Sequence, residues 1–196
     1  MLSSLLIVES YLERGITPAE HPGSFGFPIF LSYLALVTFA SARHAKRVIE
    51  TKREPAAIRT HGHLALAYAS MAASAAIVVY AILFRSGISV IFLALSVVGV
   101  LIGRGMLRYG ASPPAFPRAW FYEHMGAMIG AGVAFHTAFA VFGSNRLFGI
   151  QASGAWGILP WILPAAVGIT GEALLVRRYR KRYGDPRPGR SLATQA

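Results

Sequence analysis

Cysteine is absent from this chain of 196 residues, and charged side chains are scarce. The lack of cysteine excludes disulfides, thiolate nucleophiles, iron–sulfur clusters and cysteine-type zinc sites, so any metal chemistry must use His, carboxylate or Met. Charged residues make up only 14% of the chain, whereas soluble domains contain roughly 25%. Hydrophobic residues make up 55%, and the mean hydropathy is positive at +0.51. This composition predicts a membrane protein.

The motifs of standard membrane enzymes are also missing. The chain has no HExxH, no phosphate-binding GxxxxGK[ST], no GxSxG and no set of His boxes. Whether it is an enzyme therefore stays open. Lys and Arg outnumber Asp and Glu by 19 to 8, but they lie in loops and in a tail between apolar stretches rather than on a soluble surface. This placement argues against nucleic acid as a partner.

Five apolar stretches are long enough to cross the ~30 Å hydrocarbon core of a bilayer. They run over roughly 28–48, 63–84, 88–109, 119–142 and 155–176. The predicted fold is all-α, a five-span transmembrane helical bundle over 28–176 that is followed by a basic cytoplasmic tail, 177–196. Residues 1–27 are too short a run to span the membrane and predict a periplasmic or interfacial segment, with a short helix at the membrane surface, a loop at 21–28 and no cleavable signal.

The distribution of Lys and Arg predicts the orientation in the membrane. The loop after the first span contributes six of them, the connection between spans three and four contributes three, and the tail contributes seven. Only Arg14, Arg85 and Arg146 fall on the other side. By the positive-inside rule the N-terminus lies outside and the C-terminus in the cytoplasm. We expect a multi-pass protein of a bacterial inner membrane, with membrane lipids as partners.

The span 119–142 carries ionisable side chains within an apolar helix: Glu123, His124 and His136. Such groups are costly at membrane depth and usually face a bundle interior or a cavity, so each marks a candidate functional site. The same span contains a GxxxG pattern at Gly126 and Gly130. Small residues let another helix approach closely, so this helix is expected to lie at the centre of the bundle.

Helical spacing places further titratable side chains on the packing faces of other spans. Three more glycines are predicted to lie at helix contacts: Gly99, Gly103 and Gly168. His63 lies on a stripe of small residues in the second span, and Glu172 does so in the fifth. At ~1.5 Å per residue, His63, Glu123, His124 and Glu172 fall in one layer near the cytoplasmic face.

This layer is compatible with several kinds of chemistry. His63 and His124 could ligate the iron of haem b from opposite sides, or the two His with Glu123 and Glu172 could bind a transition metal. Without a cofactor, a His and Glu cluster could pass protons, and the groups could also pair merely to satisfy one another. The leading hypothesis is a haem or metal site that serves electron transfer. The alternatives are a non-enzymatic subunit or scaffold that binds lipids, other membrane subunits or a second copy of itself, and proton-coupled transport through a His/Glu relay.

Histidines outside this layer carry less information. His136 lies deeper, where no other span offers a histidine, and is predicted to be a hydrogen-bonded polar residue of the core. His21 and His44 lie in or beside predicted loops. His61 cannot share the stripe of His63, because two residues turn a helix by ~200°.

Three segments resemble an uncharacterised bacterial family of multi-pass membrane proteins. They are IRTHGHLALAY, WFYEHMGAMIGAGVAFHTAF, and a closing GILPWILPAAVG with its RRYRKRY tail, and the resemblance covers roughly 55–182. It implies a helical bundle with paired histidines on the cytoplasmic side, but supplies no activity because that family has no known function. The usual His-Arg entry is replaced here by His61-Gly-His63, so either histidine can be the equivalent one.

Overall fold

The computed structural model describes residues 2–87, 89–112, 116–143, 147 and 159–186, and among these it contains helices and no strands. The α-helices are α1 (Leu2–Glu13), α2 (Pro22–Glu50), α3 (His61–Leu83), α4 (Ser89–Ala111), α5 (Ala119–Ala138) and α7 (Leu159–Tyr183). A 3-10 turn, Pro55–Ile58, lies between α2 and α3, and a π-helical turn, Phe139–Gly143, extends α5. The predicted all-α fold is confirmed.

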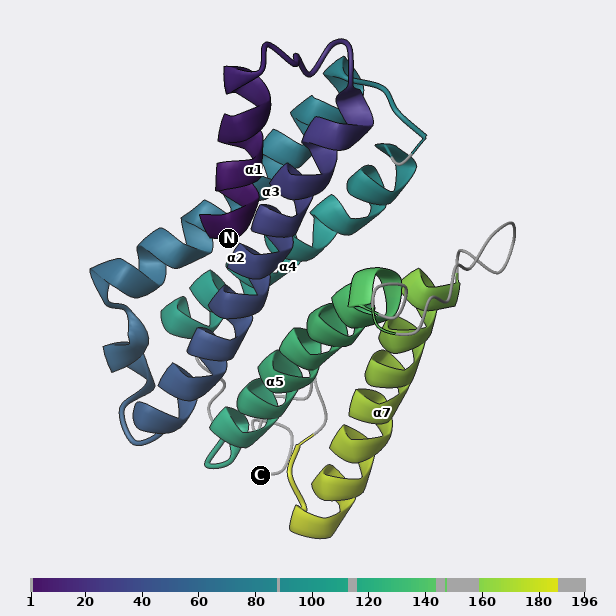
Figure 1. Ribbon diagram of the computed structural model, residues 1–196. Coiled ribbons are helices and arrows are strands. Elements are labelled where there is room, and N and C mark those ends of the chain that lie inside the picture. The colour runs from purple at the N-terminus through teal and green to yellow at the C-terminus, as the bar shows by residue number, and fades with distance from the viewer. Residues whose placement is uncertain (1, 88, 113–115, 144–146, 148–158, 187–196) are drawn as a thin grey trace.

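Five of these helices are long and apolar enough to cross a membrane: α2, α3, α4, α5 with its π-helical turn, and α7. Consecutive spans run in opposite directions, so the start of α2 and the end of α7 lie at opposite ends of the bundle (Figure 1). The helix α7 continues beyond the predicted end of its span at 176. The part of the predicted tail from 187 to 196, and the predicted start of the last span at 155–158, lie outside the described residues.

The N-terminal segment departs in detail from the predicted boundaries. α1 runs alongside the first half of α2 (Figure 1), and the ring of Tyr11 lies 5.4 Å from the ring of Phe25. The predicted loop at 21–28 is wrong, because α2 already begins at Pro22. Proline is tolerated in a first turn, where the missing N–H has no acceptor within the helix, so only Pro28 removes a backbone hydrogen bond.

The helix α2 is the centre of the bundle, so the prediction that the helix 119–142 lies there is wrong: only 11% of the membrane-spanning window of α5 is buried. The helix α2 packs against α1, α3, α4 and α5, and half of its membrane-spanning window is buried. Aromatic side chains fill the upper part of this core, where Phe30 stacks on Phe92 of α4 at 4.6 Å. The Tyr33 hydroxyl donates to the carbonyl of Leu95 at 2.8 Å and accepts from the backbone N–H of Gly99 at 2.9 Å. These contacts join α2 to α4 at membrane depth.

Two glycines allow α3 and α4 to approach closely, as the sequence predicted for Gly99 and Gly103. A Cβ atom added at Gly99 would lie 2.8 Å from the carbonyl oxygen of Ser70, and one at Gly103 would lie 2.5 Å from that of Ala67. Real Cβ atoms essentially never come so close to another heavy atom. The α3–α4 interface therefore requires glycine at both positions.

The helices α5 and α7 form an antiparallel hairpin, which packs against α2 mainly through α5 (Figure 1). Gly168 of α7 faces the side chain of Val133, and Gly126 of α5 faces the carboxylate of Glu172. The Ser41 hydroxyl of α2 donates to the carbonyl of Ala127 at 2.8 Å. No described residue of α7 is buried, so this helix lies at the edge of the bundle.

The α3–α4 interface can be tested with single alanine substitutions. We expect Gly99→Ala and Gly103→Ala each to lower the free energy of unfolding by about 1–3 kcal/mol, because the new methyl group forces two backbones apart. The measurement is the thermal unfolding midpoint of the purified protein in detergent. Gly105→Ala is the matched control in the same helix, since its Cβ would meet nothing within 4 Å. Equal midpoints for all three variants would contradict this account of the interface.

Candidate functional site

A histidine and a glutamate from two helices meet near the basic end of the bundle. His44 Nε2 of α2 lies 2.8 Å from Glu123 Oε1 of α5, and the two side chains are 4% and 32% exposed. The neighbouring residue His124 donates from Nδ1 to the carbonyl of Ala45 at 3.0 Å. Two consecutive residues of α5 thus bind two consecutive residues of α2. This double contact fixes both the depth and the rotation of α5 against the central helix.

A second histidine lies on the other side of His44. The ring of His63, at the start of α3, has its centroid 5.3 Å from that of His44 and is 1% exposed. Tyr109 of α4 meets the His44 ring edge-on at 5.8 Å. Neither nitrogen of His63 has a hydrogen-bond partner among the described residues, nor does Nδ1 of His44. Buried polar atoms are usually paired, so these three nitrogens are exceptions among the described residues.

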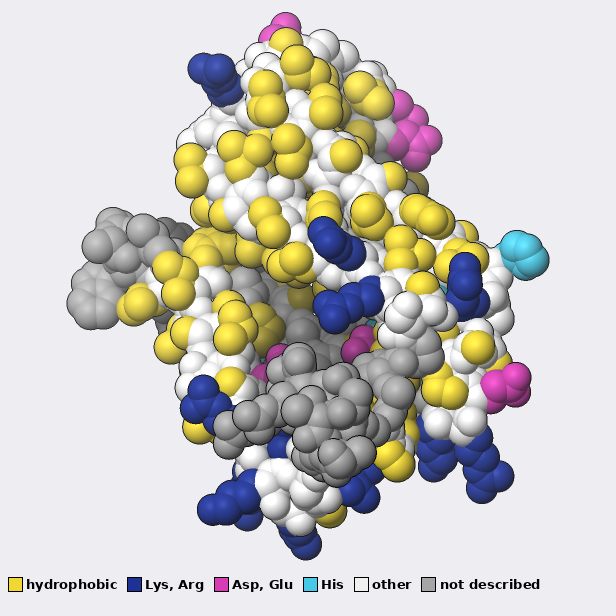
Figure 2. All heavy atoms as spheres, turned by 180° about the vertical axis from the view of Figure 1, so that it is seen from behind, with side chains coloured by type: hydrophobic (Ala, Val, Ile, Leu, Met, Phe, Trp, Pro, Cys, Tyr) yellow, Lys and Arg dark blue, Asp and Glu magenta, His cyan; other side chains and the backbone are white. Residues whose placement is uncertain are grey.

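The cavity beside this pair brings residues of four helices together. It has a volume of about 210 Å³, and we call it the polar cavity. Its lining consists of Ser41, His44, Ile102, Gly105, Met106, Tyr122, Glu123, Gly126, Ala127, Gly130 and Glu172. Two of the predicted site residues, Glu123 and Glu172, therefore face one space. Figure 2 shows acidic side chains within a hollow on one face of the molecule, below a largely hydrophobic surface.

The remaining predicted residues lie elsewhere. His61 is exposed at the start of α3, so His63 is the buried member of that pair. His136 is also exposed, and its Nδ1 donates to the carbonyl of Gly132 in its own helix at 2.7 Å. Its predicted place in the core is therefore wrong, although it is hydrogen-bonded as expected. The reason is that α5 packs mainly on α2 and α7, which leaves the side chain of His136 uncovered.

The geometry does not favour haem bound between His63 and His124. His63 approaches α2 from α3 and packs on the ring of His44, whereas His124 approaches α2 from α5 and donates to the carbonyl of Ala45. The enclosed His63 ring also packs directly against His44, which leaves no space for a macrocycle at its face. In the described part of the chain, no three His, Asp or Glu side chains are placed to hold a metal ion. A haem or metal site is therefore not the function that this arrangement supports best.

The sequence did not identify His44 as a site residue. It was assigned to the margin of a loop, but α2 is helical as far as Glu50 and places His44 inside the bundle. A signal was present: Val37, Ser41, His44 and Val48 recur at helical spacing, and all are buried. The buried face of α2 continues beyond the hydrophobic part of the sequence. There the charged residues between Ser41 and Val48 make the helical pattern hard to recognise.

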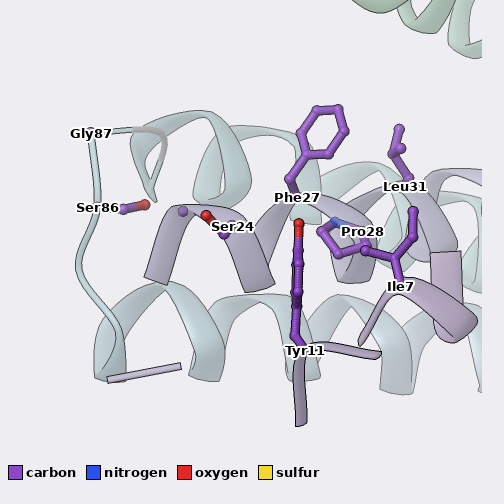
Figure 3. A pocket seen from close by; sticks show the side chains of 9 residues that line it. Ile7, Tyr11, Ser24, Phe27, Pro28, Leu31, Ser86 and Gly87 are labelled. Atoms are coloured by element: carbon purple, nitrogen blue, oxygen red, sulfur yellow. The ribbon is translucent and has the colours of Figure 1, made fainter. Parts of the chain in front are cut away.

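A second cavity lies at the opposite end of the bundle. It has a volume of about 590 Å³ and is lined by Ile7, Tyr11, Gly23, Ser24, Phe27, Pro28, Leu31, Ser86 and Gly87. Figure 3 shows that side chains of α1 and α2 face one another across it. Its described lining contains no carboxylate, imidazole or basic side chain. Of the two cavities, the polar cavity is the one whose described lining contains carboxylates and an imidazole.

A salt bridge connects Asp185, just after the end of α7, with Arg118, just before the start of α5. Gly184 has a φ of 67°, a left-handed conformation that favours glycine and turns the chain after the helix. The turn places the Asp185 carboxylate 2.9 Å from Arg118 Nε and 2.8 Å from the Tyr122 hydroxyl. The hydrogen bond from Arg118 holds the pKa of Asp185 below its ordinary value. Because Tyr122 also lines the polar cavity, this contact helps to position the cavity wall.

The Asp185 contact makes a testable contribution to the order of the α7 end. A carboxylate whose pKa is lowered by folding stabilises the folded state above its unfolded pKa, and this stabilisation is lost as the pH falls through the folded pKa. We expect Asp185→Asn to reduce hydrogen-exchange protection at Arg180–Asp185 several-fold at neutral pH. In the wild type the same loss should occur only below the ordinary Asp pKa of 3.8. Lys181→Gln, at an exposed position in the same turn, is the control, and equal protection in all three proteins would argue against the contact.

Comparisons with known proteins give no information on the function of the polar cavity. The chain matches no protein-family model, no curated protein and no solved structure. The resemblance to an uncharacterised bacterial family therefore stays a prediction. The functional conclusion depends on the His44–Glu123 pair and on the polar cavity beside it.

Proposed function

We propose that this chain is a proton-coupled transport protein of a bacterial inner membrane, which works through a His/Glu relay at the polar cavity. The observation that carries the proposal is the 2.8 Å contact between His44 and Glu123 at the wall of that cavity. Ionisable groups within membrane helices that face a cavity are typical of proton relays and substrate pathways. A purely structural pair would require neither a cavity nor the second carboxylate that faces it.

The relay follows from the order of the side chains across the bundle. An imidazole can accept a proton on one nitrogen and release one from the other, near neutral pH. His44 has Nε2 at Glu123, while its Nδ1 has no partner among the described residues. His63 lies on one side of this pair, and Glu172 lies across the cavity on the other. These groups of α3, α2, α5 and α7 would serve as the proton carriers of the relay, with the His44–Glu123 contact as its one direct hydrogen bond among the described residues.

The orientation is supported by the distribution of charge. The basic loop after α2, the end of α4, the start of α5 and the end of α7 all lie at one end of the bundle (Figure 1). On the face seen in Figure 2, most Lys and Arg side chains lie over the lower half, and hydrophobic side chains dominate the upper half. The positive-inside rule assigns this basic end to the cytoplasm. The polar cavity would then lie near the cytoplasmic face.

A second candidate is a subunit that serves mainly to bind other membrane helices. It is favoured by α7, none of whose described residues is buried. Apolar side chains on this helix are strongly exposed, for example Val167 at 65% and Ile169 at 67%. A partner helix from another subunit or from a second copy would cover such a face. This role requires no titration at the polar cavity, so a flux measurement separates the two candidates.

The orientation can be tested because the chain lacks cysteine. Ala56→Cys places a single thiol in the exposed loop after α2, and Gly87→Cys places one in the exposed α3–α4 turn. We expect a membrane-impermeant maleimide to label the thiol at 87 in spheroplasts. It should label the thiol at 56 only after permeabilisation. The reverse pattern would invert the proposed topology.

Proton movement can be tested with the full chain in proteoliposomes. We expect the wild type to dissipate an imposed pH gradient, followed with an entrapped pH-sensitive dye, when a mixture of small amines, amino acids and inorganic ions is supplied on one side as possible coupled solutes. Glu123→Gln should slow this dissipation by about tenfold or more, because the charge-assisted contact with His44 is lost. Glu54→Gln, at an exposed loop position, should leave the rate unchanged. Indistinguishable rates for the wild type, Glu123→Gln and protein-free vesicles would support the subunit role instead.

A further inference from the structure

We infer that the polar cavity binds a small alkylammonium cation in exchange for a proton. This names the class of solute for the transport proposed above, and it rests on that proposed function. The inference follows from the charge of the cavity, from the room around Glu172, from the buried imidazole at its wall and from its apolar surfaces.

The charge of the cavity is the first argument. Two carboxylates, Glu123 and Glu172, face the same space, and none of its described lining residues is Lys or Arg. Like charges repel strongly where the surroundings exclude water. A single positive charge in the cavity relieves this repulsion, and it can be carried either by an added proton or by a bound cation. The two therefore compete for one site.

The room around Glu172 is the second argument. A Cβ atom at position 126 would lie 2.8 Å from Glu172 Oε1, so glycine lets this carboxylate rest over α5, and a larger residue would make the end of the Glu172 side chain shift. No hydrogen bond or ion pair of Glu172 occurs among the described residues, whereas Glu123 is already bound to His44. Glu172 is therefore the free carboxylate that an incoming ammonium group can meet.

The imidazole of His44 is the third argument, because it can hold the exchanged proton. His44 is 3% exposed, lines the cavity, and has an unpartnered Nδ1. The titratable groups that face it from the surrounding helices are His63 of α3, Tyr109 of α4, Glu123 and Tyr122 of α5, and Glu172 of α7. A proton on His44 neutralises Glu123 directly. A cation between Glu123 and Glu172 makes that proton unnecessary, so it can leave.

The apolar part of the lining favours an organic cation over a metal ion. Ile102, Met106 and Ala127 supply hydrocarbon surface within a volume of about 210 Å³. Hard metal cations such as calcium prefer six to eight oxygen ligands, which these walls do not provide. An alkylammonium group can place its N–H donors on the carboxylates and its carbon chain against Ile102 and Met106. The ligand class is thus a short primary amine in its protonated form.

The test is calorimetric titration of the full-length protein with propylammonium chloride, in buffers of different ionisation enthalpy that report proton release. We expect saturable binding with release of protons, and an apparent affinity that falls as the pH is lowered. 1-Propanol has nearly the same shape without the charge and should not bind. Potassium chloride at equal concentration should not displace propylammonium.

Two variants test the site itself. Glu172→Gln removes the free carboxylate and should weaken propylammonium binding by about tenfold or more. Gly126→Ala makes the end of the Glu172 side chain shift and should weaken binding by a smaller factor. Gly132→Ala is the matched control on α5, because its Cβ would meet nothing within 4 Å, and it should bind as the wild type does. Unchanged thermal midpoints would show that the variants are folded.

The inference is overturned if the wild type does not bind propylammonium, if 1-propanol binds equally well, or if Glu172→Gln leaves binding unchanged. These results are distinct from a failure of the proposed function. Proton flux that depends on Glu123 without propylammonium binding would refute the solute class alone. Binding that depends on Glu172 in a protein without proton flux would refute the transport proposal and leave the cation site standing.

Discussion

A polar side chain at membrane depth must find its hydrogen-bond partner inside the protein. His44 and Glu123 are each other's partner, and the arrangement of the helices around them depends on this contact. The contact joins the most buried helix, α2, to α5, which carries α7 with it. If the two groups turned toward lipid, each would remain unpaired in hydrocarbon, at a cost of several kcal/mol. The rotation of α5 about its axis is therefore restricted by this contact together with the hydrogen bonds of His124 and Ser41. Every other feature of the candidate site follows from this orientation.

Small residues then decide how closely the helices approach. Glycine at 99 and 103 lets α3 reach the backbone of α4, and glycine at 126 leaves room for the Glu172 carboxylate beside α5. The first pair produces a tight interface, whereas the third leaves a space between α4 and the α5–α7 hairpin. The same kind of residue thus serves packing in one place and a cavity in another. A glycine produces a tight interface where the neighbouring helix presents its backbone to it, and it leaves a cavity where the neighbour presents a polar side chain.

Much of the architecture could be predicted from local patterns. The five spans, the absence of strands among the described residues and the packing role of Gly99 and Gly103 depend on hydrophobic length and on small-residue spacing, which act within one or two helices. The start of α2 was predicted too late because two prolines in its first turns resemble a loop, although the first of them costs no hydrogen bond. The site was predicted in part. Glu123, Glu172 and His63 were identified as titratable groups of one layer, but the partner of Glu123 was not.

The sequence by itself determined that this chain must form a bundle of apolar helices with its titratable groups near a basic end, because hydrocarbon length, helical period and charge placement are properties of single segments. Only the tertiary structure decided that His44 binds Glu123, that His63 packs on His44, and that His124 donates to the carbonyl of Ala45. Those facts depend on the order in which the helices surround α2 and on their rotation. Order and rotation are set by close packing between helices that are distant in the chain, and no single segment carries that information.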